Sequence, residues 1–167
     1  EYALLAGTSL FKLPDQVTFE EGALVEPLAV AYRAVMQAQV TPLDRVAVLG
    51  AGTIGLLCLA VAKSMGFHTT ITAKYEHQMN LAEDFGADHV LHTGLQDITQ
   101  EIETLTHHRG ADCVIDTIGA AQTFNEATHI VRKGGTICLV GGYTDPLNLF
   151  LAPIVSKELQ IRGSCCY

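Results

Sequence analysis

The sequence predicts an α/β fold, with a doubly wound parallel sheet of six strands and helices on both faces. Two observations support this fold class. Between residues 45 and 162, short apolar runs alternate with segments of helical periodicity, which is typical of parallel strands connected by helices. The runs are also almost uninterrupted in apolar residues, as strands buried on both faces require.

Each expected element has a local signal. Residues 46–49 are wholly apolar and indicate the first strand, and the helix after them ends at Gly66, a residue type common just past helix C-termini. The spacing of Ile98, Ile102 and Leu105 is helical. In order, the sequence predicts strands at 45–49, 69–73, 89–92, 111–115, 136–140 and 159–162, and helices at 53–66, 76–85, 97–108, 120–131 and 153–157.

The first 44 residues do not follow this alternation. Thr18-Phe19-Glu20-Glu21 has the pattern of a capping box, in which Thr18 and Glu21 satisfy each other's backbone amides. We expect a helix from this point to about Gln39, with a break at Pro27. The sequence therefore divides into residues 1–40, a linker and helix, and residues 41–167, a nucleotide-binding domain.

Composition argues against several classes of function. Eighteen acidic residues against ten basic ones give a net charge of −8, which disfavours nucleic-acid and membrane partners. No apolar stretch reaches the roughly 20 residues that cross a bilayer. Five cysteines without a C-x-x-C pair suggest free thiols in a reducing cytoplasm. The chain starts at Glu1 without an initiator methionine, which is consistent with a fragment.

A glycine-rich turn follows the first expected strand. Gly50-Ala51-Gly52-Thr53-Ile54-Gly55 fits the G-x-G-x-x-G fingerprint of the Rossmann dinucleotide fold, in the required place between a strand and a helix. The first glycine permits the turn, the second lets backbone approach a pyrophosphate, and the third lets helix and strand pack closely. The helix N-terminus then offers free amides to the phosphates. A turn needed only for packing is the alternative.

The end of the second strand is expected to bind the adenosine ribose. An acidic residue there would favour NAD, but the sequence reads Ala73-Lys74-Tyr75, and Glu76 lies beyond the strand end. Lys74 offers a cation to a 2′-phosphate, and Ala73 leaves room for it. NADP is therefore favoured over NAD, although Lys74 could also be an ordinary solvated lysine.

Two later strand ends are candidates for the same edge of the sheet. The fourth strand is followed by Ile118 and Gly119, and the fifth ends at Val140-Gly141-Gly142. Glycines here would leave space for the second ribose and the nicotinamide, or they could be turn glycines without a ligand. Asp116 could cap the helix that follows.

In combination, these motifs resemble the medium-chain dehydrogenase/reductase family, specifically its zinc-dependent alcohol and polyol dehydrogenase branch. The resemblance covers essentially the whole chain. It rests on residues 13–15, 21–31, 48–55, 86–88, 134–141, 157–159 and 163–164.

The resemblance implies roles for residues outside the glycine turn. Glu26 stands where relatives carry the third protein ligand of a catalytic zinc, or a carboxylate bonded to zinc-bound water; the alternative is a helix carboxylate that pairs locally. Ser164 and Cys165 match a stretch whose backbone contacts the nicotinamide amide. The other zinc ligands would lie in a preceding catalytic domain.

The implied activity is hydride transfer between NAD(P) and a small alcohol or carbonyl, with this chain catalytically incomplete. Relatives are often dimers or tetramers, so a homo-oligomer is expected. A zinc-independent quinone or enoyl reductase, a non-catalytic dinucleotide-binding module and an S-adenosylmethionine-dependent methyltransferase are the alternatives.

Overall fold

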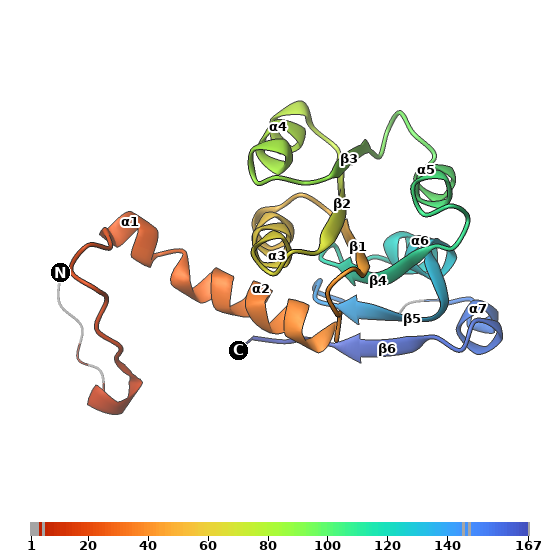
Figure 1. Ribbon diagram of the computed structural model, residues 1–167. Helices are drawn as coiled ribbons and strands as arrows, with labels where there is room; N and C mark the ends of the chain where they lie inside the picture. Colours follow the sequence, from red (N-terminus) through yellow and green to blue (C-terminus); the bar gives the residue numbers. More distant parts are fainter. Residues whose placement is uncertain (1–3, 5, 145, 147, 167) are drawn as a thin grey trace.

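The computed structural model describes residues 4, 6–144, 146 and 148–166. Its centre is one six-stranded parallel sheet in the order β3-β2-β1-β4-β5-β6, which confirms the predicted doubly wound fold (Figure 1). The strands are β1 (Arg45–Leu49), β2 (His68–Ala73), β3 (His89–His92), β4 (Ala111–Asp116), β5 (Val131–Leu139) and β6 (Gln160–Gly163).

Helices cover both faces of the sheet. One face carries α3 (Thr53–Ser64) and α4 (Glu76–Asp84), and the other carries α5 (Ile98–Leu105) and α6 (Ala121–Ile130), as Figure 1 shows. Strand β1 serves both layers because its side chains alternate: Val46 and Val48 pack with α3, whereas Ala47 and Leu49 pack with α6. A short helix, α7 (Ala152–Ser156), precedes β6.

The N-terminal segment forms a 3₁₀ turn, η1 (Gly7–Ser9), then α1 (Phe19–Gly22) and α2 (Val25–Gln37). The predicted capping box is present, with Glu21 N 3.2 Å from Thr18 Oγ1 and Thr18 N 2.8 Å from Glu21 Oε2. The prediction of a break at Pro27 is wrong. The interruption lies before Val25, and Pro27 occupies the first turn of α2, where a helix leaves amides unpaired anyway.

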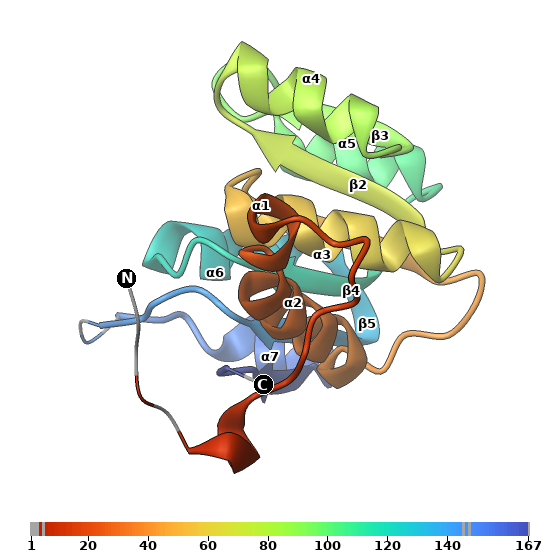
Figure 2. The ribbon, with the colours of Figure 1, turned by 90° about the vertical axis from the view of Figure 1, so that its left-hand side faces the viewer.

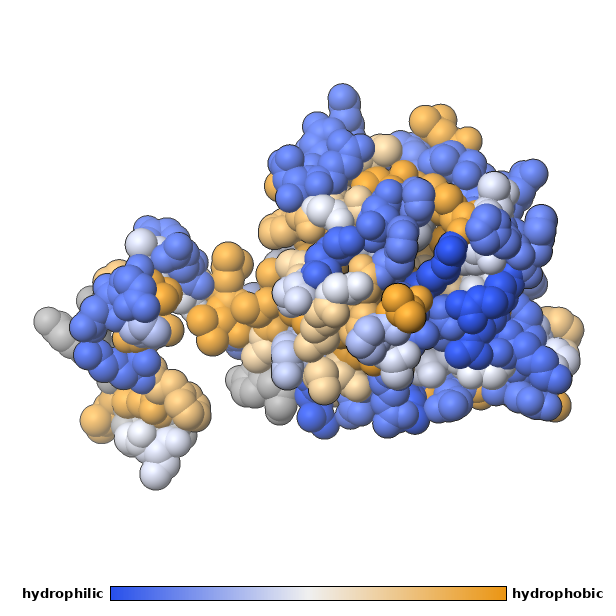
Figure 3. All heavy atoms as spheres, in the orientation of Figure 1, coloured by the Kyte–Doolittle hydropathy of each residue, from blue (hydrophilic) through white to orange (hydrophobic). Residues whose placement is uncertain are grey.

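Helix α2 is anchored to the sheet by its small residues. Ala31, Ala34 and Val35 are buried, and they join the same core cluster as α3. Figure 2 shows α2 beside α3. The thiol of Cys138 on β5 lies 3.5 Å from Ala34 O, which places α2 directly over the sheet. The opposite side of α2 is exposed and apolar (Figure 3).

Strand β5 begins five residues earlier than the sequence predicts. Helix α6 ends at Ile130, and the chain enters the sheet at Val131, opposite Ala111. The pair Gly134-Gly135 therefore lies within the strand instead of closing the helix, and the register with β4 shifts there. A Cβ on Gly135 would lie 2.6 Å from Val131 Cγ2, so only glycine allows this close passage.

Helix α5 is shorter than the expected 97–108. Asp97 is its N-cap and accepts a hydrogen bond from Gln100 N at 3.1 Å. His107 and His108 adopt left-handed backbone with φ of 52° and 61°, which cannot continue a right-handed helix. None of the helices among the described residues is both long and apolar enough to span a bilayer.

Candidate dinucleotide site

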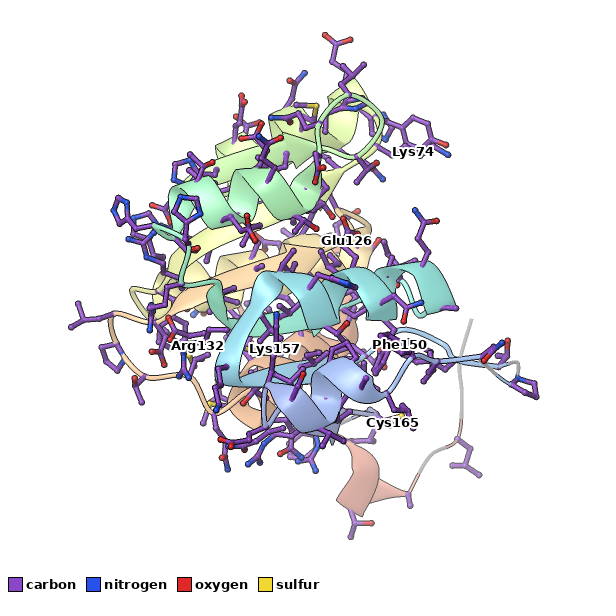
Figure 4. All side chains as sticks on the ribbon, turned by 90° about the vertical axis from the view of Figure 1, so that its right-hand side faces the viewer. Lys74, Glu126, Arg132, Phe150, Lys157 and Cys165 are labelled. Carbon is purple, nitrogen blue, oxygen red and sulfur yellow. The ribbon has the colours of Figure 1, made fainter. Side chains whose placement is uncertain are left out.

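The candidate site lies at the carboxyl edge of the sheet, where the strand order reverses between β1 and β4. In open α/β sheets this reversal leaves a crevice beyond the strand ends. The site residues predicted from the later strands end or follow β2, β4, β5 or β6, and they therefore lie at this edge. Figure 4 shows Lys74 and Cys165 toward the same side of the sheet, with Arg132 toward the other.

The three fingerprint glycines differ in their surroundings as the sequence motif predicts. Gly50 has a φ of 97°, which favours glycine, and a Cβ there would lie 2.7 Å from Ile118 Cγ1. A Cβ on Gly55 would lie 1.8 Å from Gly50 O, so this helix position and the turn are in backbone contact. A Cβ on Gly52 would meet no atom within 4 Å. The space over Gly52 is open to a ligand.

Helix α3 begins directly over that space. Its N-cap is Gly52, which has no side chain to cover the first-turn amides of Thr53 and Ile54. The turn itself is held from β2, because Gly50 N donates to Thr72 Oγ1 at 3.0 Å. The free amides and the positive end of the helix dipole make this point suitable for an anion. Sequence reasoning missed Thr72.

A cavity of about 260 Å³ connects the glycine turn to the end of β2. Ala73 is buried at its wall, and Lys74 and Tyr75 are exposed at its rim. Lys74 Nζ lies 5.6 Å from the centre of the Tyr75 ring. Lys74 takes part in none of the ion pairs among the described residues, so its charge is available to a ligand. The cavity is lined by Gly50, Ala51, Gly52, Thr72, Ala73, Lys74, Tyr75, Gln78, Thr93 and Ile118.

An adjoining cavity of about 570 Å³ extends from Lys74 toward α6 and has an acidic wall. Burial raises the pKa of Glu126, and the nearby charges of Asp116 and Asp97 raise it further. Figure 4 shows Glu126 on α6, between Lys74 above it and Lys157 below it. The crevice is therefore basic at the end of β2 and acidic at α6.

Asp116 organises the loop between β4 and α6. It is fully buried, and its Oδ1 accepts hydrogen bonds from Ile118 N at 2.9 Å and Gly119 N at 3.2 Å. Its Oδ2 accepts from Thr123 Oγ1 at 2.8 Å and Tyr143 OH at 2.6 Å. The interpretation of Asp116 as a helix cap needs correction, because the N-cap of α6 is Ala120 and the carboxylate binds the preceding loop.

The loops after β4 and β5 touch through their backbones. A Cβ on Gly141 would lie 2.3 Å from Gly119 N, and Gly119 has a φ of 82°. Val140 N and Gly141 N both donate to Asp116 O. These contacts give Gly119 and Gly141 a packing role, whereas a Cβ on Gly142 would meet open space.

The end of β6 completes the edge. Ser164 N donates to Leu139 O at 2.9 Å, which fixes this segment beside the end of β5. The Ser164 hydroxyl is buried and has no hydrogen-bond partner among the described residues. Cys165 is exposed. Glu26 is exposed on α2, and its negative charge contributes to raising the pKa of Cys166, after the larger effects of Cys165 and burial.

The described residues contain no group of three or more His, Cys, Asp or Glu side chains placed to hold a metal ion. Glu26 therefore supplies at most one carboxylate, and a zinc ion needs about four ligands, of which three are protein groups in catalytic sites. These residues alone do not form a zinc site.

Comparison with known proteins agrees with this geometry. The family described as zinc-binding dehydrogenase matches residues 53–167. This chain belongs to the zinc-binding dehydrogenase family. It is 35% identical to L-idonate 5-dehydrogenase of Vitis vinifera over 158 residues, which cover 92% of this chain and 43% of that protein. The chain thus spans about half the length of the relatives that it matches.

Solved structures of dehydrogenases have the same fold. The 2R,3R-butanediol dehydrogenase of Bacillus subtilis superposes with a TM-score of 0.87 and 30% identity, over 94% of this chain and 45% of that one. A putative zinc-binding dehydrogenase from Sinorhizobium meliloti, solved bound to NADP, superposes with a TM-score of 0.84 and 27% identity, over 93% and 47%.

Proposed function

We propose that this chain is the cofactor-binding half of a zinc-dependent alcohol or polyol dehydrogenase, which transfers hydride between NAD(P) and a small alcohol or carbonyl. The observation that carries the proposal is the contrast among the glycines. Gly50 and Gly55 are closed in by neighbouring atoms, whereas Gly52 faces open space at the start of α3. Packing accounts for Gly50 and Gly55, and the open space over Gly52, next to the free amides of α3, is where a pyrophosphate would approach the backbone.

The residues at the edge of the sheet have distinct roles in this proposal. Amides at the start of α3 bind the diphosphate, and Ala73, Lys74 and Tyr75 surround the adenosine ribose. Ile118, Gly119 and residues 140–142 contact the second half of the cofactor, and Ser164 and Cys165 contact its carboxamide. When bound, the nicotinamide accepts or donates the hydride, and the chain holds it in a fixed orientation. The buried Ser164 hydroxyl, which has no hydrogen-bond partner in the part of the chain that the structure describes, supports a polar group at that end.

Calorimetric titration with NADPH, NADH and S-adenosylmethionine tests the proposal. We expect binding of a nicotinamide cofactor and none of S-adenosylmethionine. Gly52→Val should abolish cofactor binding and leave the circular dichroism spectrum and melting temperature unchanged, because the added side chain fills the space over the turn. Gly7→Val is the matched control, since its Cβ also meets open space but lies in η1, in the N-terminal segment. Unchanged affinity in Gly52→Val would remove the glycine turn from the site.

We further propose that the chain prefers NADP over NAD. The exposed ammonium of Lys74, with no ion-pair partner among the described residues, supports this preference, as does the lack of an acidic residue at Ala73. The Sinorhizobium meliloti relative was solved with NADP. Lys74→Ala should weaken NADPH binding about three- to tenfold and leave NADH binding unchanged. Lys12→Ala is the control, because Lys12 pairs with Asp15 in the N-terminal segment.

The proposal includes zinc only in a longer protein that contains this chain. We propose that Glu26 contributes a carboxylate to, or next to, a zinc whose other ligands lie outside these 167 residues. Residues 1–40 would then join the catalytic domain to residues 41–167, and the apolar outer face of α2 supports such a covering partner. Metal analysis of a full-length dehydrogenase and its Glu26→Ala variant tests this, and a zinc-free protein would favour a zinc-independent quinone or enoyl reductase.

A further inference from the structure

The five cysteines fall into two groups that differ in exposure. Cys58, Cys113 and Cys138 are buried in the core. Burial raises the pKa of Cys58 to about 12 and that of Cys138 to about 11. Since the thiolate is the reactive form, these buried thiols are poor nucleophiles. Cys165 and Cys166 are both exposed, so the accessible thiols of the described chain are confined to one point.

The two exposed thiols are already close together. Their Sγ atoms lie 3.6 Å apart, so closing a disulfide of about 2.05 Å needs an approach of about 1.5 Å. Because neighbouring Cα atoms are only about 3.8 Å apart, the disulfide closes a strained eight-membered ring and must move the local backbone. Residues 164–166 follow the last residue of β6 and belong to no strand or helix. Sheet hydrogen bonds therefore do not hold the two cysteines in place against such a movement.

The pair also lies at a functional edge of the sheet. The preceding residue, Ser164, donates a backbone hydrogen bond to Leu139 O at the end of β5, beside the glycines that follow this strand. A dinucleotide whose diphosphate sits at the end of β1 crosses the strand reversal, with one half over β2 and the other over β4 to β6. Because Lys74 and Ala73 mark the adenosine half, the cysteines lie on the nicotinamide half.

We propose that Cys165 and Cys166 form a redox-active dithiol that closes to a disulfide and thereby weakens binding of the nicotinamide half of the cofactor. The oxidant is a small disulfide such as glutathione disulfide. One cysteine thiolate attacks it, forms a mixed disulfide and releases one glutathione; the other cysteine then attacks the protein sulfur of the mixed disulfide and releases the second. The pair loses two electrons and two protons, and one glutathione disulfide becomes two thiols.

The effect on the cofactor rests on the proposed function. Drawing the two sulfurs together moves the backbone of Cys165, whose amide is proposed to contact the nicotinamide carboxamide. Loss of one neutral hydrogen bond corresponds to about fivefold weaker binding. The adenosine half should be unaffected, because Lys74 and the glycine turn lie at the ends of other strands.

Mass spectrometry of the chain after treatment with glutathione disulfide tests the chemistry. We expect a mass decrease of two hydrogen atoms, and a peptide map that joins Cys165 to Cys166. Cys165→Ser and Cys166→Ser are the matched variants, and each should keep one glutathione because the second attack is impossible. A wild-type chain that keeps glutathione, links to a second chain or does not react would overturn the dithiol.

Cofactor affinity of the reduced and oxidised chain tests the regulatory effect. NADPH should bind about fivefold more weakly to the oxidised chain. Adenosine 2′,5′-bisphosphate, which lacks the nicotinamide, should bind both forms equally. Equal NADPH affinity would overturn the regulatory effect while leaving the proposed function intact. If neither ligand binds the reduced chain, the proposed function and its regulation both fail, and the dithiol is judged by its mass spectrum alone.

Discussion

The phenol of Tyr143 donates a hydrogen bond to Asp116 Oδ2 across 2.6 Å, and this bond ties the loop after β5 to the loop after β4. Burial raises the pKa of Tyr143, and the hydrogen bond to Asp116 raises it further, so the phenol stays protonated and keeps donating at any ordinary pH. The same carboxylate holds the amides of Ile118 and Gly119. Two walls of the candidate crevice are therefore fastened to one buried side chain.

Removing this donor should loosen the crevice. In Tyr143→Phe, Asp116 loses one of its four side-chain hydrogen bonds, so the free energy of unfolding should fall by about 1.5 kcal/mol, and NADPH binding should weaken. Urea denaturation and calorimetry measure the two effects. Tyr32→Phe, on the exposed face of α2, is the control and should change neither quantity. A Tyr143→Phe chain with the same free energy of unfolding as the wild type would show that this hydrogen bond contributes nothing to stability.

Gly55 should tolerate no side chain. Because a Cβ there would lie 1.8 Å from Gly50 O, Gly55→Ala must push α3 away from the turn, and we expect a loss of about 3 kcal/mol in unfolding free energy. Gly163→Ala, whose methyl group meets open space, should lose far less. Equal melting temperatures for the two variants would contradict the close packing of helix and turn.

Leu43 is a place where the chain can be stabilised. This residue is 92% exposed and has a φ of 85°, a left-handed conformation that costs a residue with a Cβ about 1 kcal/mol. Leu43→Gly should raise the melting temperature, because glycine adopts this conformation without steric conflict. Leu95→Gly, at a residue that is 83% exposed but lacks a positive φ, should give no such gain.

Asp112, at the amino edge of the sheet, should make the free energy of unfolding depend on pH. Asp112 accepts hydrogen bonds from Arg45 N at 2.9 Å and Arg132 Nε at 2.6 Å, and it pairs with Arg109. Burial alone would raise its pKa, but these bonds and the Arg109 charge outweigh burial and hold the pKa below the ordinary value of 3.8.

The sign of the pH effect follows from that lowered pKa. The contribution of Asp112 is complete above pH 3.8, where the unfolded chain is also ionised, and is lost as the pH falls through the lower folded value. Asp112→Asn should lower the free energy of unfolding at neutral pH by about 2 kcal/mol and reduce its acid dependence. Urea denaturation between neutral pH and pH 3 measures both; an unchanged acid slope would assign the dependence to other carboxylates.

The sequence predicts the elements that have continuous local signals. The order of the strands follows from apolar runs, and the glycine turn follows from its position between a run and a helix. The early start of β5 could not be predicted, because glycine is common just past a helix end and only the pairing with β4 shows that Gly134 and Gly135 lie in a strand. The break before α2 was misplaced because Pro27 is acceptable in a first turn.

The candidate site was predictable only in part. Motifs identify residues whose type is unusual, such as Gly52 and Lys74. They do not reveal Thr72, which holds the turn through a hydroxyl 22 residues away, or Tyr143, which reaches Asp116 from the loop after β5. These contacts join segments that are distant in the chain, and no local pattern encodes them.

The backbone contact between Gly119 and Gly141 has a mechanical consequence. Most neighbouring loops are separated by side chains that can change rotamer and absorb a displacement, but here the amide of one loop rests against the peptide of the other. A displacement of either loop should therefore displace the other loop by a similar amount. A ligand that shifts the segment after β4 should therefore also shift the segment after β5, so that the two loops on the nicotinamide half of the proposed site move together.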